Sequence, residues 1–280
     1  MFSDVLLTVD FDRTLTDTKT VIPERNIEAI RYFIENGGTF TVNTGRSVNT
    51  LGRFSKIIPV NAPFLLYNGS ASYENGELTH CRTIAVPMWE MAEAIAESFP
   101  ELNVEIQAKD THYHIHQKQS YVEFCTAQGW NFAPAKKGMD LGPFIKLAVF
   151  GEVHDTTLDR MFYGSREELE RFSQLRQFIA ERWGEYVEVF MASPRILDVH
   201  AKGVSKIRAA RELQQRLGKK ILVCVGDAAN DIPMLDGADY AYCPADGVVA
   251  DRYENVCSCG EGAVADVIYK KIPEILQNQP

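Results

Sequence analysis

The stretch VLLTVDFDRTL at residues 5–15 joins a short apolar run to two closely spaced carboxylates. Val5–Val9 is rich in β-formers, which predicts a buried strand that ends at Asp10. Asp12 follows two residues later, so one carboxylate can serve as nucleophile or metal ligand while the other acts as general acid and base. Because close like charges are costly without a cation between them, the pair also predicts a divalent metal.

Outward from this stretch, strands and helices alternate. Residues 23–36 predict a helix, with a proline in the first turn, one apolar face and a Gly-Gly stop. Residues 39–43 and 64–67 predict a second and a third short strand. This alternation is typical of an α/β fold with a parallel sheet flanked by helices.

The middle of the chain mixes predicted helices with short strands, and the strand–helix alternation returns towards the C-terminus. One of these helices, at residues 166–183, starts with a capping box formed by Ser165 and Glu168. The sequence therefore predicts an α/β core formed by residues 1–83 and 192–280. Residues 84–191 would be an inserted α/β domain of ordinary size.

Polar residues follow three of the predicted strands: Asp10 to Asp12, Thr44-Gly45-Arg46, and Gly226-Asp227. In an open parallel sheet, ligands bind outside the carboxyl ends of the strands, so these segments should converge on one site. Asp227 and Asp231 add carboxylates, and an all-oxygen set fits Mg²⁺ rather than zinc. Each aspartate alone is more simply interpreted as a turn former or N-cap. Because polar residues follow three predicted strands in the same way, the sequence as a whole favours a site.

Two further groups suit a phosphate. Thr44 and Gly45 offer a hydroxyl and main-chain amides, although a Thr-Gly pair by itself more often marks a turn. Lys206 lies near the start of the helix predicted at 204–217, where it could neutralise a phosphate and the nucleophilic carboxylate. Lys202 competes for this role.

The composition limits the partners. With 29 basic and 38 acidic residues the net charge is −9, which disfavours nucleic acid or an anionic membrane as the main partner. A basic run at residues 200–220 is interpreted as a solvated helix face. No apolar run approaches the ~18 residues of a membrane helix, and six cysteines without a framework suggest reduced thiols. We therefore expect a cytoplasmic protein.

Three histidines, His112, His114 and His116, alternate along a predicted strand and should point to one face. Three interpretations stay open: a zinc or copper site, a polar face of the inserted sheet, and a face that touches substrate. The polar face is the simplest of them. In the last of these cases, Tyr113 and Ile115 would pack in the interior of the inserted domain.

Four segments together resemble the haloacid dehalogenase superfamily of phosphatases: DFDRTL at 10–15, NTGR at 43–46, GVSK at 203–206 and GDAAND at 226–231. The large insert between the second and third motifs resembles the Cof-like branch, subfamily IIB. The resemblance covers nearly the whole chain. It implies a Rossmann-like catalytic core at 1–83 and 192–280, and a cap domain at 84–191.

The resemblance also implies a mechanism. Asp10 would form an aspartyl-phosphate, and Asp12 would protonate the leaving oxygen and later activate water. Phosphoryl oxygens would be held by Thr44, Gly45 and Lys206; Mg²⁺ would be bound by Asp10, the Asp12 carbonyl and Asp227, with Asn230 and Asp231 close by. Lys206 is preferred to Lys202 because its distance from the GDAAND segment and the preceding Gly-Val-Ser match the family.

Two residues depart from the family pattern: Arg13 and Ala228 stand where glycine is frequent. Arg13, Arg46 and Asn68 are candidate substrate contacts. The function expected from the resemblance is Mg²⁺-dependent hydrolysis of a small phosphorylated metabolite, such as a sugar phosphate. The alternatives are a phosphomutase of the same superfamily and a catalytically retired binding or regulatory homologue. We expect no nucleic-acid or membrane partner.

Overall fold

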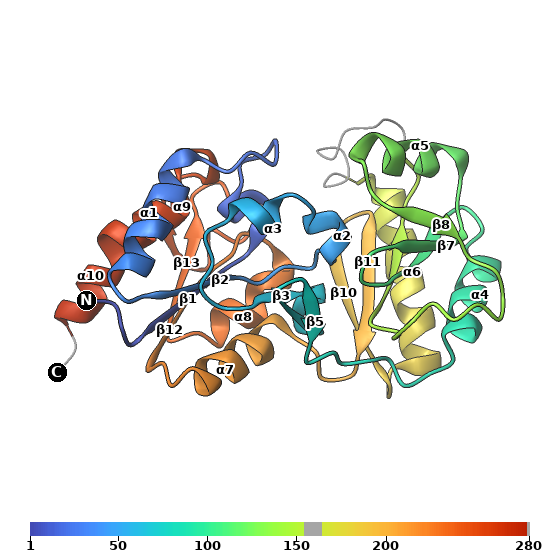
Figure 1. Cartoon of the computed structure of the whole chain (residues 1–280). Helices are drawn as coiled ribbons and strands as arrows, with labels where there is room; N and C mark the ends of the chain where they lie inside the picture. The colour runs from blue at the N-terminus through green and yellow to red at the C-terminus, as the bar shows by residue number, and fades with distance from the viewer. Residues whose placement is uncertain (154–163, 279–280) are drawn as a thin grey trace. The chain divides into compact units, whose positions relative to one another are not determined.

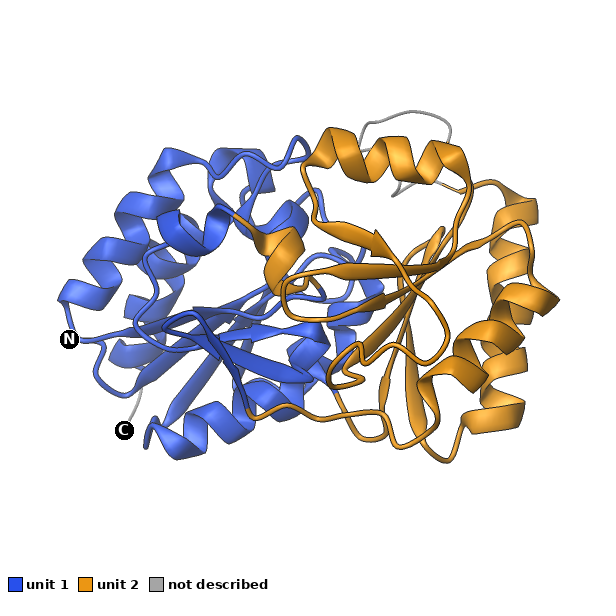
Figure 2. Cartoon of the chain, turned by 45° about the vertical axis from the view of Figure 1, so that its right-hand side comes forward, with its two compact units in different colours: residues 1–45, 53–79, 205–280 blue, residues 46–52, 80–204 orange. Residues whose placement is uncertain are grey.

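The computed structural model describes residues 1–153 and 164–278, which fall into two compact units (Figures 1 and 2). Unit 1 comprises residues 1–45, 53–79 and 205–280; unit 2 comprises residues 46–52 and 80–204. The chain therefore leaves unit 1 briefly after Gly45, and leaves it again after Thr79 for the long insertion.

Unit 1 is built on a parallel sheet of five strands in the order β14-β13-β12-β1-β2. Their bounds are β1 Val5–Val9, β2 Thr39–Val42, β12 Ile221–Val225, β13 Tyr240–Pro244 and β14 Glu254–Val256. In the pairing, Val9 lies opposite both Val42 and Val225. The carboxyl ends of β1, β2 and β12 are thus aligned, and the residues that follow these strands emerge at one edge of the sheet.

Helices cover both faces of this sheet (Figure 1). One side carries α1 (Glu24–Glu35), α9 (Ala263–Asp266), η6 (Val267–Lys271) and α10 (Ile272–Gln277); the other carries α7 (Lys206–Arg216) and α8 (Ile232–Asp236). Leu213 of α7 and Met234 of α8 join the sheet residue Leu222 in one buried apolar cluster. Burial of these apolar surfaces is the main force that holds the layers together.

Several shorter elements complete unit 1. An antiparallel trio of strands follows β2 and is linked to it by a bridge between Asn43 and Leu65. Its strands are β3 Phe64–Leu66, β4 Ala71–Glu74 and β5 Glu77–Thr79; the remaining short helices are η1 Phe11–Leu15, α3 Phe54–Ile57, η2 Tyr67–Gly69, η4 Ala229–Asp231 and η5 Cys259–Glu261.

Unit 2 contains a six-stranded sheet in the order β10-β11-β9-β6-β7-β8, antiparallel except between β7 and β8. The strands are β6 Asn103–Gln107, β7 His112–His116, β8 Phe132–Pro134, β9 Lys146–Phe150, β10 Val187–Ser193 and β11 Ile196–Ala201. The helices are α2 Val48–Leu51, α4 Met88–Ser98, α5 Gln119–Gln128 and α6 Arg166–Trp183. The expected boundary at residue 191 lies inside β10; because β10 pairs with β11, both strands join this sheet, and unit 2 extends to Val204.

The two faces of this sheet differ in polarity. One face packs an apolar core against α4 and α6, and Tyr113 and Ile115 pack against this core. The other face carries buried polar side chains, among them Glu105 and His114, beside α5. Successive strand residues point to opposite faces, so a single strand supplies both layers.

These observations confirm an α/β fold with a parallel core sheet and a separate inserted sheet. The predicted capping box at Ser165 and Glu168 is present at the start of α6. Within residues 1–153 and 164–278, no helix has the length and apolar character needed to cross a membrane. All six cysteines are free thiols. The cytoplasmic location stays a prediction.

Candidate active site

The loop that follows β1 begins at a buried aspartate. The Asp10 amide donates to the Val225 carbonyl at 2.9 Å, which ties the end of β1 to β12. The chain then turns sharply, because Arg13 adopts a left-handed conformation with φ 57°. This turn leaves Asp12 half-buried and brings Thr14 back into the buried layer.

Three buried carboxylates meet at this edge of the sheet. Asp10, Asp227 and Asp231 each offer an oxygen within 4.8 Å of the others. Among the residues that the structure describes, no other group of three or more His, Cys, Asp or Glu side chains lies this close. Carboxylate oxygens are the ligands that Mg²⁺ prefers, so the donor chemistry suits a hard divalent cation.

Lys206, the first residue of α7, supplies the positive charge. Its Nζ donates to Asp10 Oδ1 and, at 2.7 Å, to Asp231 Oδ1. Burial disfavours the charged lysine, but the two carboxylates outweigh it and hold the pKa of Lys206 above its usual value. Lys202 belongs to unit 2, where it is exposed and pairs with Glu188 at 3.4 Å. Within unit 1, the structure brings Lys206 to Asp10.

The charges in this site are not balanced. Burial raises the pKa of Asp10 to about 7; Lys206 opposes this rise, whereas Asp231 and Asp12 add to it. Burial likewise raises the pKa of Asp227, with further contributions from Asp231 and Asp10. The raised pKa values of Asp10 and Asp227 show that one ammonium does not offset three buried carboxyl groups, and a bound divalent cation would stabilise their ionised forms.

The carboxylates differ in how much of their bonding capacity is already used. Asp231 Oδ2 accepts the amides of Asp227 and Ala228, each at 3.1 Å, while Oδ1 accepts Lys206. Asp231 therefore shapes the loop and positions the lysine. Asp10 and Asp227 have more capacity left and are the better candidate metal ligands. A Cβ at Gly226 would lie 2.6 Å from Asp231 Cβ, so only glycine permits this close approach.

The segment after β2 lies at the same edge. Thr44 is buried, its amide donates to the Leu65 carbonyl, and its own carbonyl accepts the Asn68 amide, both at 2.9 Å. Asn68 itself has a left-handed backbone with φ 55°. A Cβ at Gly45 would lie only 3.0 Å from Asn68 Oδ1, so glycine keeps this turn compact.

Two residues that sequence reasoning missed hold these segments in place. Asn43 is buried, and its Nδ2 donates to the Lys206 carbonyl at 2.8 Å, which links the end of β2 to α7. The Thr14 hydroxyl donates to Asp227 Oδ1 at 3.1 Å. A polar residue at a strand end was a usable signal for Asn43, whereas nothing local distinguished Thr14.

The other predicted site residues are placed as follows. Arg46 belongs to unit 2 and donates to the Thr50 carbonyl at 2.7 Å. Asn230 is half-buried in η4, beside Asp231. Ala228 has an extended backbone with φ −123°, which any residue can adopt, so its difference from glycine costs nothing. Arg13 differs in this respect, because its left-handed backbone is one that glycine adopts without strain.

The three histidines do not form one row. His112 and His114 are buried on the polar face of the unit 2 sheet. A register shift between Val104 and Glu105 interrupts the alternation, and His116 Nε2 instead bonds the Pro100 carbonyl at 2.8 Å. The expectation that all three share a face was therefore wrong. His116 lines a surface cavity of about 320 Å³ together with Trp89, Glu93, Ala96, Glu97, Ile115, Ala135 and Lys137.

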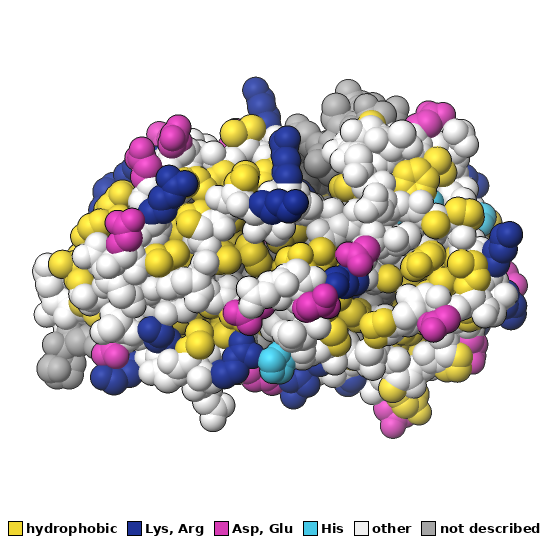
Figure 3. Space-filling model, in the orientation of Figure 1, with side chains coloured by type: hydrophobic (Ala, Val, Ile, Leu, Met, Phe, Trp, Pro, Cys, Tyr) yellow, Lys and Arg dark blue, Asp and Glu magenta, His cyan; other side chains and the backbone are white. Residues whose placement is uncertain are grey.

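Basic residues of the 200–220 run pair with carboxylates. Arg208 bonds Glu212 at 2.9 Å, and Arg211 bonds Asp239 at 2.8 Å. On the face drawn in Figure 3, acidic and basic side chains are interspersed with apolar ones. Such pairing is typical of a solvated helix surface.

Comparison with known proteins agrees with this geometry. A family model described as haloacid dehalogenase-like hydrolase matches residues 7–249. The 5-amino-6-(5-phospho-D-ribitylamino)uracil phosphatase of Bacillus subtilis is 22% identical over 241 residues, 83% of this chain and 80% of that protein.

Solved structures share the fold. A haloacid dehalogenase-like hydrolase from Bacteroides thetaiotaomicron superposes with a TM-score of 0.77 at 17% identity, over 95% of this chain and 98% of that one. A HAD subclass IIB sugar phosphatase superposes with a TM-score of 0.74 at 19% identity, over 96% and 99%. Since the family model spans most of the sequence and the fold agrees throughout, the chain belongs to the haloacid dehalogenase-like hydrolase family.

Proposed function

We propose that the protein is a Mg²⁺-dependent phosphatase that hydrolyses a small phosphorylated metabolite through an aspartyl-phosphate at Asp10. The observation that carries this proposal is the buried carboxylate of Asp10. It contacts Lys206, and one of its oxygens lies within 4.8 Å of a carboxylate oxygen of Asp227. Phosphoryl transfer needs mainly positioning and charge neutralisation, and this arrangement provides both.

In the first step, an oxygen of Asp10 forms a bond to phosphorus while the bond from phosphorus to the substrate's leaving oxygen breaks. Asp12 gives its proton to that oxygen, so the product leaves as a neutral alcohol. Asp12 suits this role because it follows the nucleophile by two residues and is half-buried rather than sealed.

In the second step, Asp12 takes a proton from a water molecule, and that water attacks phosphorus. The bond between phosphorus and Asp10 breaks, which releases inorganic phosphate and restores the carboxylate. Lys206, the Thr44 hydroxyl and the Gly45 amide hold the phosphoryl oxygens and stabilise the charge on them in both steps.

Asp10 and Asp227, with the main-chain carbonyl of Asp12, would hold the Mg²⁺. When bound, this ion supplies positive charge that favours the ionised nucleophile and offsets the negative charge of the phosphoryl group. The excess of buried carboxylates over ammonium groups supports this assignment.

Relatives support a small substrate with a phosphorylated polyol or sugar chain. The Bacillus subtilis relative is named for a ribityl phosphate and one structural neighbour is called a sugar phosphatase. We therefore place sugar and polyol phosphates first in a substrate screen.

The test measures phosphate release from a generic aryl phosphate and from a panel of sugar and polyol phosphates, with Mg²⁺ and with chelator. Asp10→Asn should lower the rate by at least about 10³-fold, because the amide is a poor nucleophile. Asp17→Asn is the matched control, since Asp17 accepts amides of its own turn. Asp12→Asn should accumulate a phosphate adduct on Asp10 that mass spectrometry detects. Activity that survives Asp10→Asn, or that ignores the chelator, would contradict the proposal.

A further inference from the structure

The segment that follows the proposed phosphate-binding turn belongs to unit 2. Gly45 is the last residue of unit 1 before the chain enters residues 46–52 of unit 2. Within this segment, Ser47 caps α2: its hydroxyl accepts the Thr50 amide at 3.0 Å, and its amide donates to the Thr50 hydroxyl at 2.9 Å. Residues 47–50 thus form a turn closed by two hydrogen bonds. The position of this turn depends on the other contacts of Ser47.

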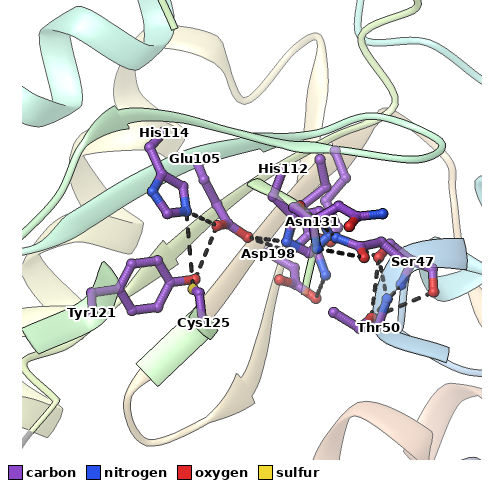
Figure 4. Close-up of polar contacts among 12 residues, drawn as sticks. Ser47, Thr50, Glu105, His112, His114, Tyr121, Cys125, Asn131 and Asp198 are labelled. Atoms are coloured by element: carbon purple, nitrogen blue, oxygen red, sulfur yellow. Dashed lines mark hydrogen bonds and ion pairs between the residues drawn. The ribbon is translucent and has the colours of Figure 1, made fainter. Parts of the chain in front are cut away.

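A buried histidine holds it. Ser47 Oγ lies 2.8 Å from His112 Nε2, and both side chains are fully buried (Figure 4). A second contact supports the first: Asn49 donates to the Asn131 carbonyl at 2.8 Å and accepts the Asn131 amide at 3.0 Å. The segment is therefore attached to the β7 side of the unit 2 sheet at two points.

A buried glutamate orients the histidine. Glu105 Oε1 lies 3.1 Å from His112 Nδ1, and Gln107 donates to the same oxygen at 2.7 Å. The other oxygen, Oε2, accepts the Tyr121 hydroxyl at 3.0 Å and lies 3.4 Å from His114 Nε2. With a proton on Nδ1 facing this carboxylate, His112 Nε2 is left as an acceptor for the Ser47 hydroxyl. Figure 4 shows Glu105 between the two histidines, on the strands of the sheet.

The order Ser47, His112, Glu105 has the connectivity of a serine–histidine–acid triad. Two observations exclude Ser47 as a nucleophile in this conformation. Its side chain has no exposed surface, and its oxygen already accepts the Thr50 amide. The arrangement therefore holds a segment of main chain instead of attacking a substrate.

The hydrogen bond between Ser47 and His112 holds one end of the short segment that runs from Thr44 to Ser47. Thr44 is fixed on one side by its main-chain bonds to Leu65 and Asn68. Ser47 is fixed on the other side by His112. Only Gly45 and Arg46 lie between these two anchors, so the direction of the Gly45 amide depends on both.

We propose that Glu105, His112 and Ser47 form a latch that sets the geometry of the phosphate-binding turn at Thr44 and Gly45. The three are positioning residues, and this role rests on the proposed phosphatase function.

The test compares His112→Phe with His114→Phe. Both substitutions remove a buried histidine from Glu105, but only His112 contacts Ser47, so His114→Phe is the matched control for lost stability. We expect kcat/KM for an aryl phosphate to fall about tenfold in His112→Phe, the effect of one lost positioning contact. Inhibition by inorganic phosphate should weaken by a similar factor, whereas His114→Phe should keep both values.

Two further measurements exclude a merely structural effect. Ser47→Ala should reproduce the loss, and the double variant with His112→Phe should be no worse than either single one, because both remove the same bond. His112→Gln, whose amide reaches the position of Nε2, should recover part of kcat/KM. Equal kcat/KM in His112→Phe and His114→Phe would overturn the latch.

Hydrogen–deuterium exchange separates this proposal from the proposed function. Amides of residues 44–52 should exchange faster in His112→Phe than in His114→Phe, whether or not the native protein hydrolyses phosphate esters. If the native protein is inactive but the exchange differs as expected, the phosphatase proposal fails and the latch stands as a structural tether. Unchanged exchange in His112→Phe would reject the latch itself.

Discussion

Thr14 and Asp227 lie 213 residues apart in the chain, yet the Thr14 hydroxyl donates a hydrogen bond of 3.1 Å to Asp227 Oδ1. This bond joins the loops that follow β1 and β12. Asp227 offers a carboxylate oxygen within 4.8 Å of oxygens of Asp10 and Asp231. Because both residues are buried, the bond fixes the carboxylate in one orientation.

We predict that Thr14→Val weakens Mg²⁺ binding by about 10- to 100-fold, the usual effect of removing a residue that orients a metal ligand. Isothermal titration calorimetry measures this affinity directly. Thr41→Val is the control, since Thr41 makes a comparable buried bond to the Pro63 carbonyl away from the carboxylates. It should lose similar stability and keep its Mg²⁺ affinity. Equal affinities in the two variants would contradict the role given to Thr14.

Lys206 should be far more important for turnover than Lys202. Lys206→Met removes the ammonium beside Asp10 and Asp231, so we expect kcat to fall by about 10²- to 10³-fold. The variant should also unfold more easily, because two carboxylates stay buried without their partner. Lys202→Met removes only an exposed ion pair and should keep its activity. Steady-state kinetics on both variants decide between the two lysines.

Arg13 should carry backbone strain that glycine relieves. Its φ of 57° costs a side-chain-bearing residue about 1–2 kcal/mol, and part of this is recovered in Arg13→Gly. Arg13→Ala is the matched control, because alanine removes the guanidinium and keeps the strain. We expect Arg13→Gly to be about 1 kcal/mol more stable than Arg13→Ala in urea unfolding. If Arg13→Ala is as stable as Arg13→Gly, the change in stability comes from loss of the arginine side chain and not from relief of backbone strain.

The acid sensitivity of unit 2 should depend on Glu105. Burial alone would raise the pKa of Glu105, but His112 and His114 outweigh it and hold the pKa well below its usual value of 4.5. A lowered folded-state pKa contributes stability above pH 4.5 that is lost progressively as the pH falls below it.

Glu105→Gln should therefore be less stable than the native protein near neutral pH, by about 1–3 kcal/mol, and the difference should shrink below pH 4.5. Urea unfolding at a series of pH values measures this. Glu123→Gln, on the exposed side of α5, should follow the native curve. A constant gap between the native and Glu105→Gln curves at all pH values would contradict this account.

The sequence by itself predicted the edge of the sheet at which the candidate site lies. Parallel strands end at one edge, so Asp10, Thr44 and Asp227 could be brought together on strand positions alone. It also predicted the start of α6, because a capping box is a local contact between Ser165 and Glu168. In both cases the signal is contained in a few neighbouring residues.

In β6 the polar residues Glu105 and Gln107 alternate with the apolar residues Val104 and Ile106, and this alternation is a sequence signal for a polar face. The prediction that His112, His114 and His116 share one face was wrong because it considered a single strand. A register shift beside Glu105 turned His116 away, and periodicity within one strand cannot reveal how its partner is aligned.

Only the tertiary structure decided which distant residues pair. The bonds from Thr14 to Asp227, from Asn43 to the Lys206 carbonyl and from Ser47 to His112 join segments separated by 65 to 213 residues. Such contacts depend on the registers of two sheets and the paths of several loops, and an error of one residue moves a side chain to the opposite face. The sequence therefore pointed to the residues of the candidate site, while packing selected the residues that hold them in place.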